Sequence, residues 1–172
     1  MNSIVFNYHQ NVLNGIVRGK EWKEMANSVE HIFKLQTSWD GGRNDTGEIH
    51  CEKLKTTMSI PSEMGGPGIG TNPDELLLSA AASCYIISLA AMLERSNVKS
   101  RLSLQSEGIV QVENNVFTYK KIIHHIEITL QEVSDSNKRI AERLALKAEE
   151  SCMISRALRG NVVVTVDCTI AE

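Results

Sequence analysis

The fold is decided by the stretch GGPGIGTNPDELLLSAAASCYIISLAAML, which runs from Gly65 to Leu93. Its first part is rich in glycine and proline, a composition that is typical of a loop. Asn72 is a favourable N-cap, and Pro73 is well tolerated at the first position of a helix. From residue 76 to residue 93 almost every side chain is apolar or small, which predicts a helix buried on all sides. Its many alanines and serines, and the strand patterns close to both ends, favour a core helix over a membrane span.

Strand patterns precede and follow this helix. Residues 31–39 roughly alternate between polar and apolar, as expected for a half-buried strand. Asn114 and Asn115 separate two well-alternating stretches and predict a hairpin turn. The expected strands are residues 31–39, 47–53, 54–60, 101–112, 117–130 and 162–170, and a second helix is expected at residues 136–152, with Asp135 or Ser136 as its N-cap. The element order βββ-α-ββ-α-β predicts an α+β fold.

Composition limits the classes of function. The chain has 172 residues, 42% hydrophobic and 23% charged, which suits one compact domain or a domain that completes its core by dimerising. The net charge is −3 and basic residues form no run, so nucleic-acid binding is not expected. No stretch is predicted to span a bilayer, and residues 1–10 lack the regions of a signal peptide. We therefore expect a cytoplasmic protein without a membrane partner.

The four cysteines, Cys51, Cys84, Cys152 and Cys168, are too few and too scattered for the disulfide framework of a small secreted domain. None forms a C-x-x-C pair, so a structural zinc site is poorly supported. Each could be an inert packing thiol, the common role of a buried cysteine, and spacing alone selects no pair. The sequences that flank Cys84 and Cys152 decide between packing and chemistry.

Three separated motifs surround these two cysteines and an early turn. They are GGPGIGTNPDEL (residues 65–76) leading into AAASCY (residues 80–85), AEESCMISRA (residues 148–157), and Gly41-Gly42-Arg43. In content and order they resemble the OsmC/Ohr family, in which a G-x-N-P-E-x-L loop opens the helix of the reactive cysteine. The second cysteine motif of that family reads A-x-x-x-C-P-x-S-x-A, and a G-G-R turn follows its first strand. The resemblance covers roughly residues 30–170.

The resemblance implies an OsmC-like fold, in which a bent antiparallel sheet wraps around two long central helices. It also implies an intertwined homodimer with the active sites at the subunit interface. The apolar helix supports a dimer independently, because the strands of one chain would hardly cover it.

The implied activity is thiol-dependent reduction of organic hydroperoxides, with hydrogen peroxide as a further candidate substrate, in oxidative-stress defence. Cys84 would attack as a thiolate and become a sulfenic acid, and Cys152 would then form the Cys84–Cys152 disulfide. A dithiol, such as a lipoylated protein, would reduce that disulfide. Arg43 would stabilise the thiolate, and Asp74 would hold Arg43 through a bidentate pair. No metal, haem or flavin cofactor is implied.

Two substitutions separate this chain from the family pattern near the site. Asp74 is one methylene shorter than the usual glutamate, so either Asp74 or its neighbour Glu75 would hold Arg43. Met153 replaces the proline that usually follows the second cysteine. Without this helix stop, the second helix is expected to continue past Cys152.

Other interpretations stay open at this stage. The resemblance leaves residues 1–30 as an N-terminal extension of a single domain at residues 31–172. A protein of this fold could instead bind a small apolar ligand in the dimer cleft, or serve only as a structural protein with inert thiols. His124 and His125 are adjacent on a strand and would point to opposite faces, so they make a poor pair of metal ligands.

Overall fold

The structure, a computed structural model, describes residues 29–171. The chain divides into two units, residues 1–35 and residues 36–172. All helices and strands described below lie in the second unit, except that the first strand begins at Leu35. The extension predicted at residues 1–30 lies almost entirely outside the described residues. The described elements are strands β1 (Leu35–Trp39), β2 (Gly47–Cys51), β3 (Lys55–Met58), β4 (Ser100–Glu113), β5 (Val116–Leu130) and β6 (Val163–Ala171), helices α2 (Pro73–Arg95), α3 (Asp135–Ser151) and α4 (Met153–Leu158), and the short 3-10 helix η1 (Ser62–Met64).

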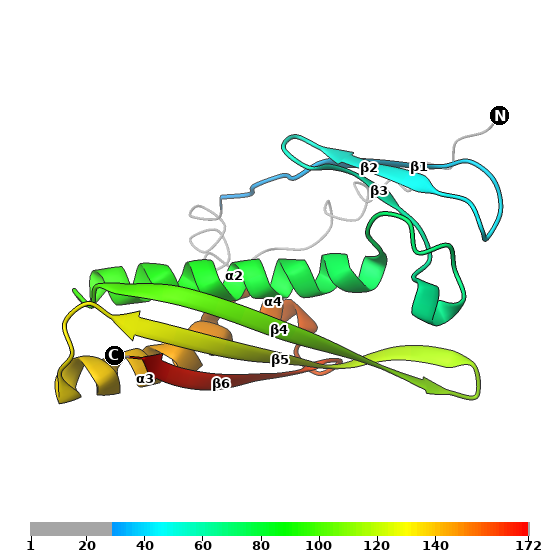
Figure 1. The fold of residues 1–172 in the computed structure, drawn as a ribbon. Coiled ribbons are helices and arrows are strands. Elements are labelled where there is room, and N and C mark those ends of the chain that lie inside the picture. Colours follow the sequence, from blue (N-terminus) through cyan, green and yellow to red (C-terminus); the bar gives the residue numbers. More distant parts are fainter. Residues whose placement is uncertain (1–28, 172) are drawn as a thin grey trace, which may run out of the picture. The chain divides into compact units, whose positions relative to one another are not determined.

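The described strands form two three-stranded sheets, ordered β1-β2-β3 and β4-β5-β6. The α+β class and the order βββ-α-ββ-α-β are confirmed, with η1 and α4 as short additions. Figure 1 shows α2 running alongside the long strands of the second sheet. The predicted hairpin is also confirmed, because β4 and β5 pair antiparallel and Asn114 and Asn115 have φ of 51° and 62°. Positive φ at both central residues is the mark of a tight hairpin turn.

The direction of β6 corrects the expectation of an antiparallel sheet. β5 and β6 pair in parallel, from Lys121 opposite Val163 to Thr129 opposite Ala171. Two parallel strands need a long crossover connection, and α3 with α4 forms it. The second sheet is therefore mixed.

The first strand is shorter than predicted and is not half-buried. It begins at Leu35 rather than His31, and all five of its residues are exposed. Phe33, an apolar residue of the predicted half-buried strand at residues 31–39, is 91% exposed. The alternation is present in the sequence, but within the described chain nothing covers the apolar face that it creates.

Helix α2 begins as the sequence predicts. Asn72 caps it, since its Oδ1 accepts a hydrogen bond from the backbone N–H of Glu75 at 2.9 Å, and Pro73 is the first helical residue. The helix is not buried on all sides, which corrects the prediction. Its buried side chains, Ala81, Tyr85, Leu89 and Leu93, are spaced four residues apart and form a single stripe.

The opposite face of α2 is open, and Ile87 there is 68% exposed. By length and composition alone α2 could cross a membrane, contrary to the expectation that no stretch could do so. The buried stripe nevertheless packs into the core of the second unit. That core joins the last three residues of the stripe to Ala141, Leu144, Ala145 and Ala148 of α3 and to Ile126, Ile128 and Leu130 of β5. Ala81 packs in a second cluster with Ile122 and Val162.

Candidate active site

The two cysteines singled out in the sequence lie side by side. Cys84 is in the middle of α2, and Cys152 stands between α3 and α4. Their Sγ atoms are 2.7 Å apart, although 68 residues separate them, and Cys152 donates the hydrogen bond. Both are free thiols. The packing of α2 against α3 and α4 creates this contact.

The chain breaks at Cys152, contrary to the expectation that Met153 would let the helix continue. Cys152 has φ −57° and ψ 128°, an extended conformation that ends α3 at Ser151. Its Sγ then accepts a hydrogen bond from the backbone N–H of Ser155 at 3.5 Å and so caps α4. The side chain of the cysteine itself starts the new helix, so the break does not depend on proline. The N-cap of α3 is Ser134 rather than Asp135 or Ser136, with Oγ accepting from the N–H of Asn137.

The two sulfur atoms have different surroundings. Cys84 is half-buried, while Cys152 is fully buried. Burial raises the pKa of the Cys84 thiol, but hydrogen bonds more than offset this and lower the pKa below its usual value. In order of size these come from the Cys152 side chain, the backbone N–H groups of Ile154 and Met153, and the Ser88 side chain. Burial and the hydrogen bond with Cys84 raise the pKa of Cys152, against weaker opposing hydrogen bonds from Ser155 and Ile154. The thiolate therefore forms more readily on Cys84.

Arg43 lies on the turn between β1 and β2, where Gly41 adopts φ 119°. The guanidinium donates to two backbone carbonyls, through Nη1 to Gly65 at 2.7 Å and through Nη2 to Met64 at 2.6 Å. Within the described chain it forms no ion pair with Asp74 or Glu75, and no contact joins it to Cys84. The structure of one chain therefore does not bring Arg43 to the thiol pair.

The two acidic residues at the start of α2 have other neighbours. Glu75 takes part in the helix start, since it accepts a hydrogen bond from Thr71 Oγ1 at 2.9 Å and its N–H is bound by Asn72. The charge of Asp74 acts on Tyr119, where burial and then this carboxylate raise the pKa of the phenol. Neither carboxylate holds Arg43 within the chain.

Sequence reasoning missed several residues near the sulfur atoms. Ser88 lies one turn after Cys84 on α2, so the spacing i, i+4 could have indicated it. The N–H groups of Met153 and Ile154 depend on the break at Cys152, which the sequence did not predict. Ser155 belongs to the second cysteine motif, and its side chain is buried at 2% exposure.

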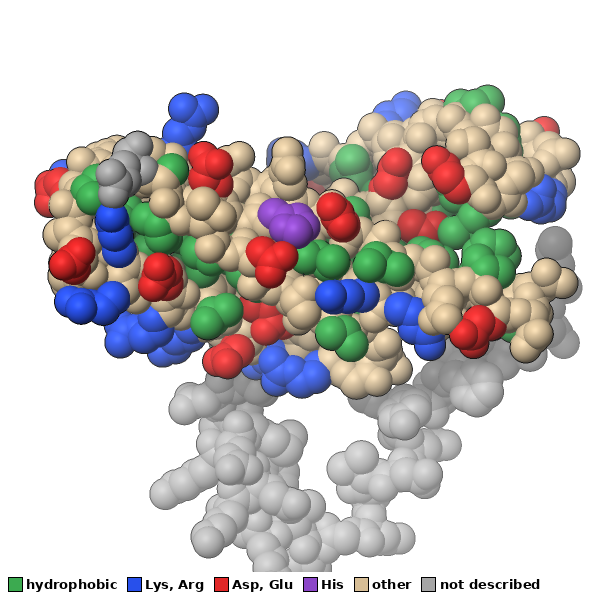
Figure 2. Space-filling model, turned by 60° about the horizontal axis from the view of Figure 1, so that its bottom comes forward, with side chains coloured by type: hydrophobic (Ala, Val, Ile, Leu, Met, Phe, Trp, Pro, Cys, Tyr) green, Lys and Arg blue, Asp and Glu red, His purple; other side chains and the backbone are tan. Residues whose placement is uncertain are grey.

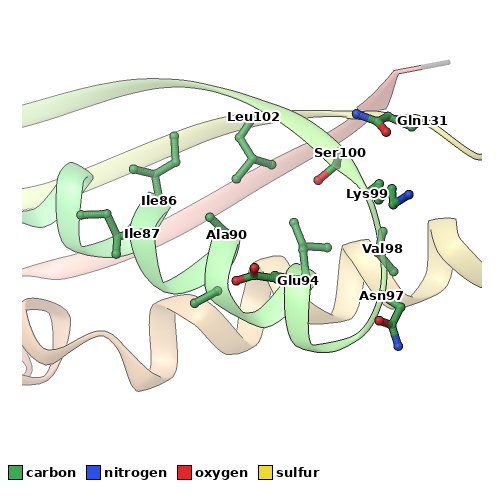
Figure 3. Close-up of a pocket in the computed structure, with 12 residues that line it drawn as sticks. Ile86, Ile87, Ala90, Glu94, Asn97, Val98, Lys99, Ser100, Leu102 and Gln131 are labelled. Atoms are coloured by element: carbon green, nitrogen blue, oxygen red, sulfur yellow. The ribbon is translucent and has the colours of Figure 1, made fainter.

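A pocket that is apolar along α2 and polar at its other end, where Glu94, Lys99 and Gln131 line it, lies farther along α2; we call it the apolar pocket. It has a volume of about 890 Å³, and Figure 3 shows Ile86, Ile87 and Ala90 of α2 and Leu102 of β4 around it. Neither cysteine lines it. The pocket is open space against the uncovered face of α2, and the thiol pair is a separate feature.

The histidines behave as the strand pattern predicts. His124 is fully buried, whereas the side chain of His125 is 41% exposed. A nitrogen of the His125 ring lies 3.2 Å from Asp167 and the other lies 3.6 Å from Glu107. Figure 2 shows one face of the molecule, on which acidic, basic and apolar side chains are interspersed. Across the described residues, no three His, Cys, Asp or Glu side chains are grouped so as to hold a metal ion.

The remaining cysteines have the surroundings of packing thiols. Cys168 lies half-buried on β6, against the main core, and burial raises its pKa. Cys51 ends β2 at a tight turn, where its N–H donates to the carbonyl of Leu54. Neither has a sulfur neighbour among the contacts of the described chain.

Fold and site together define an α+β protein in which the packing of two long helices joins two free thiols of unequal acidity. The chain belongs to the OsmC-like protein family, whose model matches residues 65–167. It is 53% identical over 144 residues to the uncharacterized protein YmaD of Bacillus subtilis, covering 83% of this chain and 96% of that protein. It is 29% identical over 146 residues to an organic hydroperoxide resistance protein of Xanthomonas axonopodis pv. citri, covering 83% and 98%.

A solved structure of an organic hydroperoxide resistance protein OsmC from Legionella pneumophila has the same fold. The TM-score is 0.64 at 25% identity, over 83% of this chain and 99% of that one. The OsmC-like fold expected from the three motifs is thus confirmed. The relatives also link the family to resistance against organic hydroperoxides.

Proposed function

We propose that this protein reduces organic hydroperoxides with its two cysteines and thereby contributes to oxidative-stress defence. The observation that carries the proposal is the 2.7 Å contact between the sulfur atoms of Cys84 and Cys152. Two thiols so close can pass from a sulfenic acid to a disulfide without a large movement of the backbone. The family and the named hydroperoxide resistance relatives agree with this chemistry.

The reaction assigns different roles to the two thiols. The Cys84 thiolate attacks one peroxide oxygen, the O–O bond breaks, and the alcohol leaves after taking up a proton. Cys84 is now a sulfenic acid. The Cys152 sulfur attacks it, a disulfide forms and water leaves. The lowered pKa and partial exposure of Cys84 suit the attacking thiol, and the buried, less acidic Cys152 suits the resolving one.

An external dithiol must complete the cycle by exchange with the Cys84–Cys152 disulfide. We propose a lipoylated protein in the cytosol as the source of that dithiol, as the family resemblance implies. Consumption of cumene hydroperoxide with dihydrolipoamide as reductant measures the whole cycle. The Cys84→Ser variant should fall to the background rate, because a serine hydroxyl is not ionised at neutral pH. A Cys84→Ser variant with full activity would contradict the proposal.

We further propose that two chains form a homodimer and that Arg43 acts across its interface. The open face of α2 exposes Ile87 at 68%, and an apolar surface of this kind is a candidate for a protein partner. Arg43 is exposed, and its guanidinium donates to two backbone carbonyls rather than to the thiols of its own chain. In a dimer it could approach the Cys84 of the second copy. Light scattering should give twice the chain mass, and Ile87→Asp should shift the protein toward the monomer.

The apolar pocket favours one alternative function, the binding of a small apolar ligand. Its volume of about 890 Å³ lies within the range of ligand sites in proteins. Counting free thiols after one equivalent of hydroperoxide separates the two functions. A reductase loses two thiols together, whereas a binding protein retains all four.

A further inference from the structure

The Cys84 thiolate needs hydrogen-bond donors within its own chain. A thiolate in a partly apolar site is unfavourable unless donors or cations surround it. The expected cation, Arg43, binds the carbonyls of Met64 and Gly65 and has no contact with Cys84 in the chain. The donors that one chain supplies therefore come from α2 and from the residues around Cys152, whatever a second copy adds in a dimer.

Ser88 is the polar side chain of α2 best placed for this role. It follows Cys84 by four residues, so both side chains lie on the same face of the helix, one turn apart. Both residues are half-buried, between the buried stripe and the open face. The Ser88 hydroxyl is also among the groups that lower the pKa of the Cys84 thiol.

Two other helix serines, Ser83 and Ser151, use their hydroxyl groups differently. A serine inside a helix commonly donates to the backbone carbonyl four residues earlier. Ser83 does so toward Ser79 at 2.7 Å, and Ser151 does so toward Lys147 at 2.9 Å. Among the hydrogen bonds of the described residues Ser88 makes no such bond to a carbonyl, and the residue four positions before it on the same face is the reactive cysteine.

We propose that Ser88 is a positioning residue whose hydroxyl donates a hydrogen bond to the Cys84 thiolate and holds this sulfur in its attacking form. The inference rests on the proposed role of Cys84 as the attacking thiol. It adds a donor that lies within the same helix and is present in a single chain. The hydrogen bond to Ser88 contributes, after those from Cys152, Ile154 and Met153, to the lowered pKa of Cys84.

The test follows the alkylation of Cys84 by iodoacetamide as a function of pH, in the full-length chain. Peptide mass spectrometry distinguishes Cys84 from the other three cysteines. None of them has to be substituted, so the hydrogen bond from Cys152 is retained. Ser88→Ala should shift the pH midpoint of alkylation upward. At pH 7 the rate should fall about threefold, because the lost thiolate is partly offset by the higher nucleophilicity of a less acidic thiol.

Ser83→Ala is the matched control. Ser83 lies on the same helix next to Cys84, but its hydroxyl is engaged with the Ser79 carbonyl, so its removal should leave the pH profile unchanged. The Ser88→Thr and Ser88→Val variants carry side chains of nearly the same shape, and only threonine keeps the hydroxyl. Threonine should retain the wild-type profile and valine should match alanine.

The proposal is overturned if Ser88→Ala and Ser88→Val alkylate with the wild-type midpoint, or if threonine shifts it as much as valine. Alkylation needs no peroxide, so the result is independent of the proposed enzyme activity. If the protein does not consume hydroperoxide but Ser88→Ala still shifts the alkylation of Cys84, the proposed function is wrong and the role of Ser88 is supported.

Discussion

Tyr85, the residue that follows Cys84, stacks on His124, with ring centroids 4.9 Å apart and an angle of 11° between the ring planes. Both residues are fully buried. His124 Nδ1 shares a hydrogen bond with Ser106 Oγ at 2.7 Å, whereas Nε2 has no partner among residues 29–171. Burial, with a smaller contribution from the charge of His125, lowers the pKa of His124. The core is therefore built around a neutral imidazole.

This buried imidazole predicts a loss of stability in acid. The folded chain resists protonation of His124, while the unfolded chain binds a proton as the pH falls through about 6.5. The contribution of the neutral ring is thus fully present above pH 6.5 and is lost as the pH falls below it. The free energy of unfolding should fall by up to about 1.4 kcal/mol per pH unit from this one group. Urea denaturation at a series of pH values from 7.5 to 5 measures the slope.

The control for acid stability is His124→Phe, which keeps an aromatic ring against Tyr85 and removes the proton-binding group. Its absolute stability differs from that of the wild type for packing reasons, so only the pH dependence is compared. Below pH 6.5 the free energy of unfolding should change less steeply with pH, by the amount that corresponds to the binding of about one proton. Equal slopes in the two proteins would show that another group causes the acid sensitivity.

Met153→Pro should raise the pKa of Cys84 while preserving the fold. Met153 is the first residue of α4, where proline is tolerated, and Cys152 before it already has the extended conformation that proline requires. The substitution removes the backbone N–H that forms a hydrogen bond with Cys84. Alkylation of Cys84 at pH 7 should slow about threefold, because one hydrogen bond to the charged sulfur is lost.

Met153→Leu is the control for that substitution, since it changes the side chain and keeps the N–H. It should alkylate as the wild type does, and the melting temperature of both variants should stay within a few degrees. Equal rates for the proline and leucine variants would mean that the N–H of residue 153 does not affect the sulfur.

Caps and turns, which are set by a few consecutive residues, could be predicted from the sequence. The cap at Asn72 with Pro73 after it, and the turn at Asn114 and Asn115, follow from local backbone chemistry, and the structure confirms them. The direction of β6 was not predictable in the same way. A strand pattern does not reveal which way the strand runs beside its partner, and that depends on where α3 and α4 bring the chain.

The same distinction applies to the site. Spacing gave no reason to join Cys84 with Cys152, and only the flanking motifs made them a pair. The partners of Arg43 are the carbonyls of Met64 and Gly65, and a backbone carbonyl has no signature in a sequence. The predicted end of the second helix at residue 152 is within one residue of the end of α3 at Ser151. The break itself was not expected, because Cys152 caps the next helix with its own sulfur, an unusual capping group.

Gly70→Ala should destabilise the protein strongly, because the loop before α2 leaves no space for a side chain. Gly70 has φ 70°, and a Cβ there would lie 2.2 Å from the carbonyl oxygen of Thr57, which is a backbone atom. Gly160 is the matched control, with φ 92° and open space around it. Gly160→Ala should cost only the backbone strain, about 1 kcal/mol. Chemical denaturation should give a loss several times larger for Gly70→Ala, and similar losses would contradict the crowding at Thr57.

Cys152→Ser should trap the reaction at Cys84 and expose it to over-oxidation. With no second thiol within reach, the sulfenic acid formed by the first equivalent of hydroperoxide has no partner for a disulfide. Further hydroperoxide should then convert Cys84 to the sulfinic acid, seen by intact mass as a gain of two oxygen atoms. The wild type should instead lose two hydrogen atoms as the disulfide forms. Cys168→Ser serves as the control, because this half-buried thiol on β6 has no part in the pair, and it should behave as the wild type does. A Cys152→Ser protein that resists over-oxidation as well as the wild type would exclude Cys152 as the resolving thiol.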